Sequence, residues 1–169
     1  MLDAELKELM ANGTPQTVHL LAGKRSQGEL VYEDVQAVPM GDDCYVLLAS
    51  PLFARGIAKG DAVRVGAAGI FEIEQYGGNV CVRVFAKSDL ASIQARLAKD
   101  LAALDAECEV ANERALVYCI NIKQGFDAIE AAFNTALQGR TDAMWLNANV
   151  YDPVDGVTPL NWWLDYLAR

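Results

Sequence analysis

Histidine is almost absent from this 169-residue sequence, and so are the common signatures of catalysis and nucleotide binding. The only histidine is His19, and none of the serines that might join it in a catalytic triad lies in a GxSxG sequence. The HExxH, Walker A and GxGxxG sequences are also missing. One histidine and scattered cysteines make a poor ligand set for zinc. We therefore expect no catalytic residue, no metal, no cofactor and no enzymatic activity.

Long apolar runs and paired cysteines are missing as well. No run reaches the roughly 18 apolar residues of a membrane helix, and residues 1–13 lack the basic and apolar parts of a signal peptide. The cysteines form no CxxC pair and all fall within apolar, strand-like runs, at Cys44, Cys81, Cys108 and Cys119. This usage is typical of buried free thiols in a reducing compartment. We expect a cytoplasmic protein with neither disulfides nor a membrane segment.

Basic residues are too few to balance the acidic ones. The 14 Lys and Arg residues stand against 23 Asp and Glu residues, which leaves a net charge of −9. Such a chain repels phosphate backbones, so we expect no direct binding to nucleic acid. Two interpretations of the charge stay open. It keeps the protein dispersed in water, or it attracts a basic protein partner.

Apolar residues, in contrast, make up 53% of the chain, which is enough for a packed core. In the first half, a short amphipathic helix ends at Asn12-Gly13, and alternating runs between turn residues then predict strands. Gly77-Gly78 is interpreted as a hairpin turn. The first half is therefore predicted to be a small barrel-like β-sheet. Its expected strands cover residues 16–22, 29–39, 44–49, 61–65, 70–76 and 79–85.

The second half changes to a helical period. Leucine and isoleucine recur at spacings of three and four, which predicts a helix over residues 88–106 with Ser88 as its N-cap. The order β-α-β-β-α-β predicts a ferredoxin-like arrangement, in which the strand 79–85 serves both halves. The fold class is thus α+β, with one domain at residues 1–78 and another at 79–169. The remaining expected elements are strands at 108–111, 114–121 and 143–151 and helices at 126–138 and 159–168.

The stretch SPLFARGIAKGD, residues 50–61, carries a family resemblance. It resembles the hallmark PFFAxGIAxGDxV of a bacterial domain-of-unknown-function family, number 4265. The matching positions are Phe53, Ala54, Gly56, Ala58, Gly60, Asp61 and Val63. The resemblance extends over residues 31–150, and Trp145 takes the place of a tryptophan often found in the last strand of the family. It implies a β-hairpin and a ferredoxin-like half after the hallmark, and it assigns no catalytic residue.

The same stretch is interpreted first as structure. Pro51 starts a turn, Phe53 enters the core, and Asp61 accepts hydrogen bonds from backbone N–H groups. Gly56 and Gly60 allow a left-handed backbone. The alternative is a binding loop, in which an anion is held by Arg55, Lys59 and Arg64 in a cleft between the two halves.

Acidic residues and large aromatic residues supply the candidate partner-binding surface. Aromatic side chains among carboxylates suit an interface with a basic protein. The alternative for the tail is that Trp162, Leu164 and Leu167 anchor it, with one tryptophan half exposed. The candidate partner-binding residues are Asp42, Asp43, Glu72, Glu74, Asp152, Asp155, Trp162, Trp163 and Asp165.

Acidity, small size and the lack of a catalytic set lead to one functional hypothesis. The chain is predicted to be a cytoplasmic immunity-type protein that neutralises a basic, nuclease-like bacterial toxin by covering its active site. The first alternative is an enzyme or small-ligand sensor with an anion site between the halves. The second is a regulatory or dimerising module that pairs through a sheet face or edge.

Overall fold

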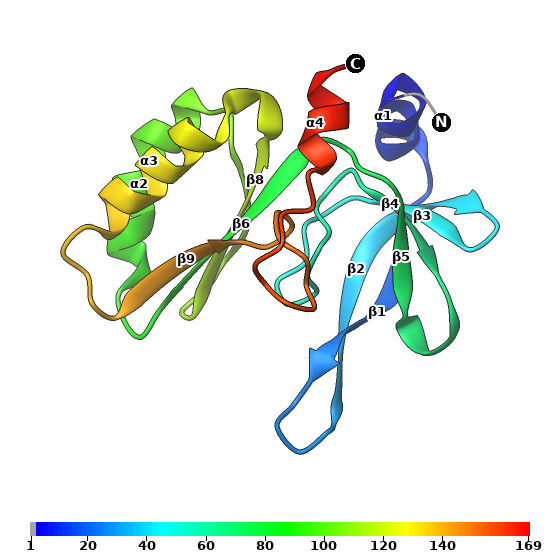
Figure 1. The fold of residues 1–169 in the computed structure, drawn as a ribbon, viewed down its shortest axis with the longest axis horizontal. Coiled ribbons are helices and arrows are strands. Elements are labelled where there is room, and N and C mark those ends of the chain that lie inside the picture. Colours follow the sequence, from blue (N-terminus) through cyan, green and yellow to red (C-terminus); the bar gives the residue numbers. More distant parts are fainter. Residues whose placement is uncertain (1–2) are drawn as a thin grey trace.

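The structure is a computed structural model that describes residues 3–169 and shows a mixed α+β fold with two antiparallel sheets (Figure 1). The first sheet has the strand order β1-β2-β3-β4-β5 and the second has β7-β8-β6-β9. The strands of the first sheet are β1 (Gln16–Lys24), β2 (Leu30–Gly41), β3 (Cys44–Leu47), β4 (Ala62–Val65) and β5 (Phe71–Gln75). Those of the second are β6 (Asn79–Ala86), β7 (Glu107–Ala111), β8 (Ala115–Asn121) and β9 (Ala143–Asn147). The helices are α1 (Asp3–Asn12), α2 (Leu90–Ala103), α3 (Phe126–Leu137) and α4 (Trp162–Leu167).

The first sheet is an open meander rather than the barrel-like sheet expected from the sequence. Within residues 3–169, its edge strands β1 and β5 do not pair with each other. The sheet curls enough for the short turn Ala67–Gly69 to meet β1, since a Cβ added at Gly69 would lie 2.7 Å from the carbonyl oxygen of His19. Helix α1 covers part of the outer face, where Leu6 packs on Val38 and Val46.

The second sheet carries α2 and α3 on one face (Figure 1). Alternation along β6 and β8 sends every second side chain towards these helices, among them Val82 and Tyr118. The opposite face carries Cys81, Val117 and Ala148 and is turned towards the first half of the chain. Strand β6 lies between β8 and β9 and belongs to this sheet alone, so the expectation that it serves both halves is wrong.

Gly77 and Gly78 join the two sheets and do not form the expected hairpin, because β5 and β6 do not pair. Both positions require glycine, because other parts of the chain lie too close to leave room for a side chain. A Cβ on Gly77 would lie 2.3 Å from the carbonyl oxygen of Gly60, and a Cβ on Gly78 would lie 2.2 Å from the ring of Tyr166. Gly78 also has a left-handed φ of 90°.

The N-cap of helix α2 lies one residue later than the sequence suggested. Its N-cap is Asp89 and not Ser88, and Asp89 Oδ1 accepts a hydrogen bond from the backbone N–H of Ser92 at 3.2 Å. Ser88 instead donates its hydroxyl to Asp142 Oδ2 at 3.0 Å. Asp89 fits the cap because aspartate tolerates the left-handed φ of 49° found there.

Strand β9 is shorter than expected, and the side-chain alternation ends with it. Trp145 packs against the helices, while Leu146 packs on the opposite face. Beyond the strand, Val150 turns to the helix side and not to the face of Leu146. The reason is Asn149, whose amide accepts from Cys81 N at 2.9 Å and donates to Asn79 O at 2.8 Å, so the backbone leaves the ladder.

The four cysteines are free thiols, but they are not all buried. Cys81 and Cys119 are buried neighbours on β6 and β8, and burial raises the pKa of both thiols. Cys44 is half-buried and Cys108 is exposed, because β3 and β7 each leave part of a face open to water.

The two ends of the described chain lie side by side at one end of the molecule (Figure 1). Arg169 donates to Asp3 Oδ1 at 2.9 Å. Among the helices found in residues 3–169, none has the length and apolar character needed to cross a membrane.

Candidate functional site

Residues 50–61, here called the hallmark segment, connect β3 to β4 and lie between the two sheets (Figure 1). Ala54 and Ile57 are fully buried against the inner face of the first sheet. Ala58 packs instead on the free face of the second sheet, with Cys81 and Val117. The hallmark segment therefore supplies core to both halves at once, which supports its interpretation as structure.

Two charged side chains hold the hallmark segment from opposite sides. From β2, the carboxylate of Glu33 accepts hydrogen bonds from the backbone N–H groups of Leu52, Phe53 and Ala54 at 2.6–2.9 Å. From β6, the guanidinium of Arg83 donates to the carbonyl oxygens of Pro51, Phe53 and Ala54. Arg83 is only 3% exposed, and burial lowers the pKa of its guanidinium.

Asp61 closes the end of the hallmark segment, as expected. It is buried and accepts from Ala58 N at 2.9 Å and from Gly77 N at 2.7 Å, so it ties the segment to the junction between the sheets. Burial raises the pKa of this carboxyl to about 7. Gly56 and Gly60 have left-handed φ values of 81° and 91°, as expected, whereas Phe53 is 54% exposed and does not enter the core.

The three cations of the expected anion site are not assembled into one. Lys59 Nζ lies 2.5 Å from Glu107 Oε2, and Arg64 Nε lies 2.7 Å from Glu74 Oε1. Both are thus neutralised by carboxylates. Arg55 remains, exposed at the edge of a groove between the halves.

Four of the nine predicted partner-binding residues meet on the first sheet, and we call them the acidic face. Asp42 and Asp43 form the turn between β2 and β3, and Glu72 and Glu74 lie on β5. Arg64 lies among them: it donates to the backbone oxygen of Asp42 at 2.8 Å, contacts Glu74, and pairs in register with Glu72. One arginine against four carboxylates leaves the acidic face negative.

The aspartates of the loop after β9 do not join the acidic face. Asp152 Oδ1 accepts from the backbone N–H of Val154 at 2.8 Å. Asp155 accepts hydrogen bonds from Val157 N and from the backbone N–H and the hydroxyl of Thr158. These hydrogen bonds, of which the one from the Thr158 hydroxyl has the largest effect, hold the pKa of Asp155 below its usual value. Both side chains stabilise the turns of their own loop.

The tail tryptophans differ from each other. Trp162 is 5% exposed, stacks on Tyr76 at 5.3 Å and donates to the carbonyl oxygen of Asn149, so it is core and unavailable to a partner. Trp163 is half-buried with its edge against Phe126. The tail is anchored by Trp162 and Tyr166, whereas Leu164, Leu167 and Asp165 stay exposed.

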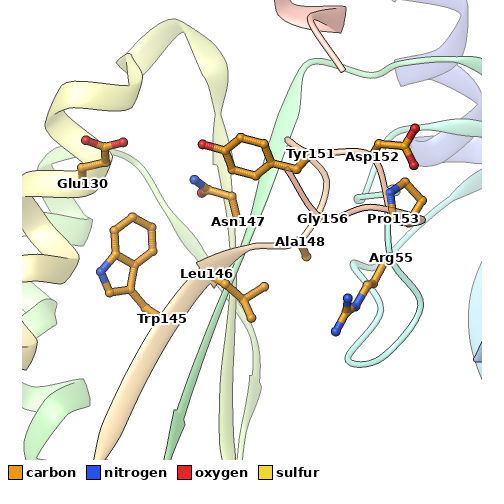
Figure 2. A pocket seen from close by; sticks show the side chains of 10 residues that line it. All are labelled: Arg55, Glu130, Trp145, Leu146, Asn147, Ala148, Tyr151, Asp152, Pro153 and Gly156. Carbon is orange, nitrogen blue, oxygen red and sulfur yellow. The ribbon is translucent and has the colours of Figure 1, made fainter. Parts of the chain in front are cut away.

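A groove of about 390 Å³ opens where the halves meet (Figure 2). Trp145 and Glu130 form one side, Arg55 and Pro153 the other, and Tyr151 extends between them. It differs from the expected cleft because it contains one cation rather than three.

No cluster of three or more His, Cys, Asp or Glu side chains suited to a metal ion occurs in residues 3–169. His19 lies on the outer face of the first sheet, with Nδ1 2.6 Å from Asp34 Oδ1 and its ring stacked on Tyr32.

Glu33, Arg83 and Asn149 were missed by the sequence analysis. Arg83 had a visible signal, since it interrupts the apolar run VCVRVF of a strand that is otherwise buried on both faces. A charged residue in such a run requires partners, and here they are the backbone of the hallmark segment. Glu33 and Asn149 have no such signal, because their roles depend on which loop lies beside them.

Comparison with known proteins places this fold in a family. The model of a family described as domain of unknown function (DUF4265) matches residues 33–145, more than half of the chain, and the chain belongs to that family. This confirms the resemblance given by the sequence. A solved structure described as a novel crystal structure of a hypothetical protein from Neisseria gonorrhoeae is similar in fold, with a TM-score of 0.63 and 15% identity. The likeness covers 80% of this chain and 94% of that one. No curated protein matches.

Proposed function

We propose that this chain is a cytoplasmic, immunity-type protein that binds a basic toxin domain and blocks it without catalysing a reaction. The observation that supports the proposal is the acidic face, where Asp42, Asp43, Glu72 and Glu74 surround a single arginine. Carboxylates arranged in this way substitute for the phosphates of a nucleic-acid substrate in a basic cleft. The same charge keeps the chain itself away from nucleic acid.

Charge of this kind acts mainly on the rate of association. Complementary potentials raise the rate constant from about 10⁵–10⁶ M⁻¹s⁻¹ towards about 10⁸–10⁹ M⁻¹s⁻¹ at low salt. Rapid capture is the property that a toxin inhibitor needs. The proposed association is therefore expected to slow steeply as salt is added.

The experiment compares two double variants with the same change in charge. Asp43→Asn with Glu72→Lys alters the acidic face. Asp105→Asn with Glu113→Lys alters exposed carboxylates elsewhere, and Asp105, like Asp43, has a left-handed φ. The partner is sought by pull-down and by protection of cells that express the product of the neighbouring gene. We expect the first variant to slow association by about tenfold and to lose protection, and the second to keep both.

Three outcomes contradict the proposal. The first is the lack of a stoichiometric partner together with no protection of cells. The second is a partner that is neutral or acidic. The third is an equal effect of the two double variants, which assigns the binding to net charge and not to the acidic face.

Small-ligand binding between the halves is a second candidate function, favoured by the groove at Arg55. The groove lies at the junction of two packed units, where ligand sites often occur. Thermal-shift measurements over a panel of charged metabolites test it, and a panel without any stabilising compound contradicts it.

We also assign the second half to the ferredoxin-like arrangement. The sheet order β7-β8-β6-β9, with every neighbouring pair antiparallel, supports this assignment. Helices α2 and α3 follow β6 and β8 in the chain and pack on the same face.

A further inference from the structure

The groove at the junction of the halves has two charged side chains without partners. Neither Arg55 nor Glu130 forms a side-chain hydrogen bond or an ion pair within residues 3–169. Arg55 comes from the hallmark segment and Glu130 from α3, and Figure 2 shows them on opposite sides of the groove. Asp152 also lines the groove, but its Oδ1 already accepts a hydrogen bond within its own loop, and Figure 2 shows its carboxylate pointing away from Arg55 and Glu130.

Aromatic rings form the walls between these charges. The Trp145 ring is fixed, because its Nε1 donates to Asn134 Oδ1 at 2.8 Å and the ring stacks on Phe133 at 5.4 Å. Tyr151, which is 43% exposed, extends across the groove. The faces of indole and phenol rings attract cations, an indole most strongly.

A hydrogen-bond acceptor without a donor completes the lining. The Oδ1 atom of Asn147 is buried and has no partner among the described residues. Asn147 ends β9, and its side chain lies between Trp145 and Tyr151 (Figure 2). A buried amide oxygen without a donor is unfavourable, so a ligand that brings an N–H donor favours a turn of the Asn147 side chain that presents this oxygen to the groove.

We propose that the groove binds a small zwitterion, a compound with a primary ammonium group at one end and a carboxylate at the other. The ammonium lies between Glu130, the Oδ1 of Asn147 and the ring of Trp145, and the carboxylate meets the guanidinium of Arg55. The volume of about 390 Å³ is large enough for a compound of amino-acid size. This inference rests on the second candidate function and is independent of the acidic face.

The experiment follows the indole N–H signals of the full chain by NMR during titration. Only three tryptophans are present, and Trp145→Phe assigns the signal that matters. The compounds are glycine, β-alanine, γ-aminobutyrate and ε-aminocaproate, with butyrate and butylamine as single-charge controls. We expect at least one zwitterion to shift the Trp145 signal with a dissociation constant of about 1 mM or tighter, and both controls to bind at least about tenfold more weakly.

Variants then test the two ends of the ligand separately. Arg55→Ala and Glu130→Gln are each expected to weaken the best zwitterion by about tenfold, because each removes one charge-assisted contact. Arg114→Ala and Glu113→Gln, exposed on the β7–β8 hairpin, are matched controls and are expected to change nothing. All these positions are exposed, so the fold is preserved.

The outcomes separate this inference from the function on which it rests. Equal binding of butyrate or butylamine overturns the zwitterion but leaves a ligand site in the groove. Binding that shifts only the Trp162 or Trp163 signal places the compound elsewhere and also overturns the inference. If no zwitterion shifts any indole signal, the inference is overturned, and the thermal-shift panel decides the second candidate function separately.

Discussion

Arg83 is the residue on which the contact between the two halves depends most directly. Its guanidinium reaches out of the second sheet and donates to three carbonyl groups of the hallmark segment. Glu33, from the first sheet, accepts hydrogen bonds from three backbone N–H groups of the same segment. Backbone N–H and C=O groups of this buried connecting segment therefore have hydrogen-bond partners on both sides.

Replacing Arg83 by methionine removes the donors but keeps most of the side-chain volume. Three carbonyl groups in a buried environment lose their partner, and we expect the free energy of unfolding to fall by about 3–5 kcal/mol. Urea denaturation measures the change. Arg114→Met is the control, because Arg114 is exposed, and it is expected to change stability by less than about 0.5 kcal/mol. A loss below about 1 kcal/mol for Arg83→Met contradicts the role assigned here.

Asp61 makes the stability of the protein depend on pH. Its pKa of about 7 in the folded protein lies above the ordinary value of 3.8, so the folded state binds this proton more tightly than the unfolded chain does. The resulting stabilisation is complete below about pH 4 and is lost as the pH rises through about 7. We expect the wild type to lose a few kcal/mol over this range relative to Asp61→Asn.

The measurement is the free energy of unfolding as a function of pH for three proteins. The profile of Asp61→Asn lacks this slope, because the amide does not titrate, although its NH₂ group faces a backbone N–H and costs some stability at every pH. Asp105→Asn changes an exposed aspartate and is expected to follow the wild type. Parallel profiles for the wild type and Asp61→Asn between about pH 4 and 7 contradict the prediction.

At the scale of an element, substitutions at Asp89 and Ser88 test which residue caps helix α2. Asp89→Ala removes the acceptor for Ser92 N and places alanine at a left-handed φ, so we expect a loss of about 1–2 kcal/mol. Asp89→Asn keeps both an acceptor and tolerance of that backbone and is expected to lose much less. Ser88→Ala serves as the control in the same thermal unfolding series. If Ser88→Ala is the more damaging change, Ser88 is the cap after all.

The connection between β5 and β6 is equally sensitive. In Gly77→Ala the new methyl group would lie 2.3 Å from the carbonyl oxygen of Gly60, which is a backbone atom that cannot turn aside. We expect a loss of about 2 kcal/mol or more, seen as a fall in Tm. In Gly66→Ala the nearest atom is 3.5 Å away, so this variant should match the wild type. Equal Tm values for the two variants contradict the close approach.

The order and type of the elements could be predicted because period and turn residues are local signals. The apolar run of residues 79–85 predicted a strand and the leucine spacing of α2 predicted a helix, and both elements are of the right type and in the right place. Pairing is not local. Nothing in Gly77-Gly78 distinguishes a hairpin from a crossing between sheets, and nothing in the strand 79–85 shows which sheet it joins. The barrel-like expectation failed for the same reason.

Site residues were harder to predict than strands. Asp61 could be placed because a short acidic side chain after glycine commonly accepts backbone N–H groups. The candidate carboxylates of the two halves looked alike in the sequence, yet Asp42 and Glu72 share one face while Asp155 stabilises its own turn. Trp162 and Trp163 are adjacent, and only the packing of α4 decides which one is buried.

At the scale of the whole molecule, the two sheets are expected to unfold together. Residues 79–169 were predicted as a separate domain, but one face of their sheet is covered by the hallmark segment, which belongs to residues 1–78. Separating the halves would expose that face and leave Arg83 without its carbonyl partners. We therefore expect one cooperative transition in urea.

Two signals report the two halves. Tryptophan fluorescence follows the second half, since all three tryptophans lie after residue 144. The backbone amide NMR signals of Val46 and Val63 follow the first sheet. Coincident midpoints are expected, and two well-separated midpoints would show that the halves are independent.

The hallmark segment lies between the two sheets, and this position constrains its length. Its small buried residues pack on both sheets and so set the distance between them. Its length is therefore fixed by geometry, in contrast to most surface connections, which tolerate insertions. Its outward positions, Arg55 among them, can change without altering that spacing.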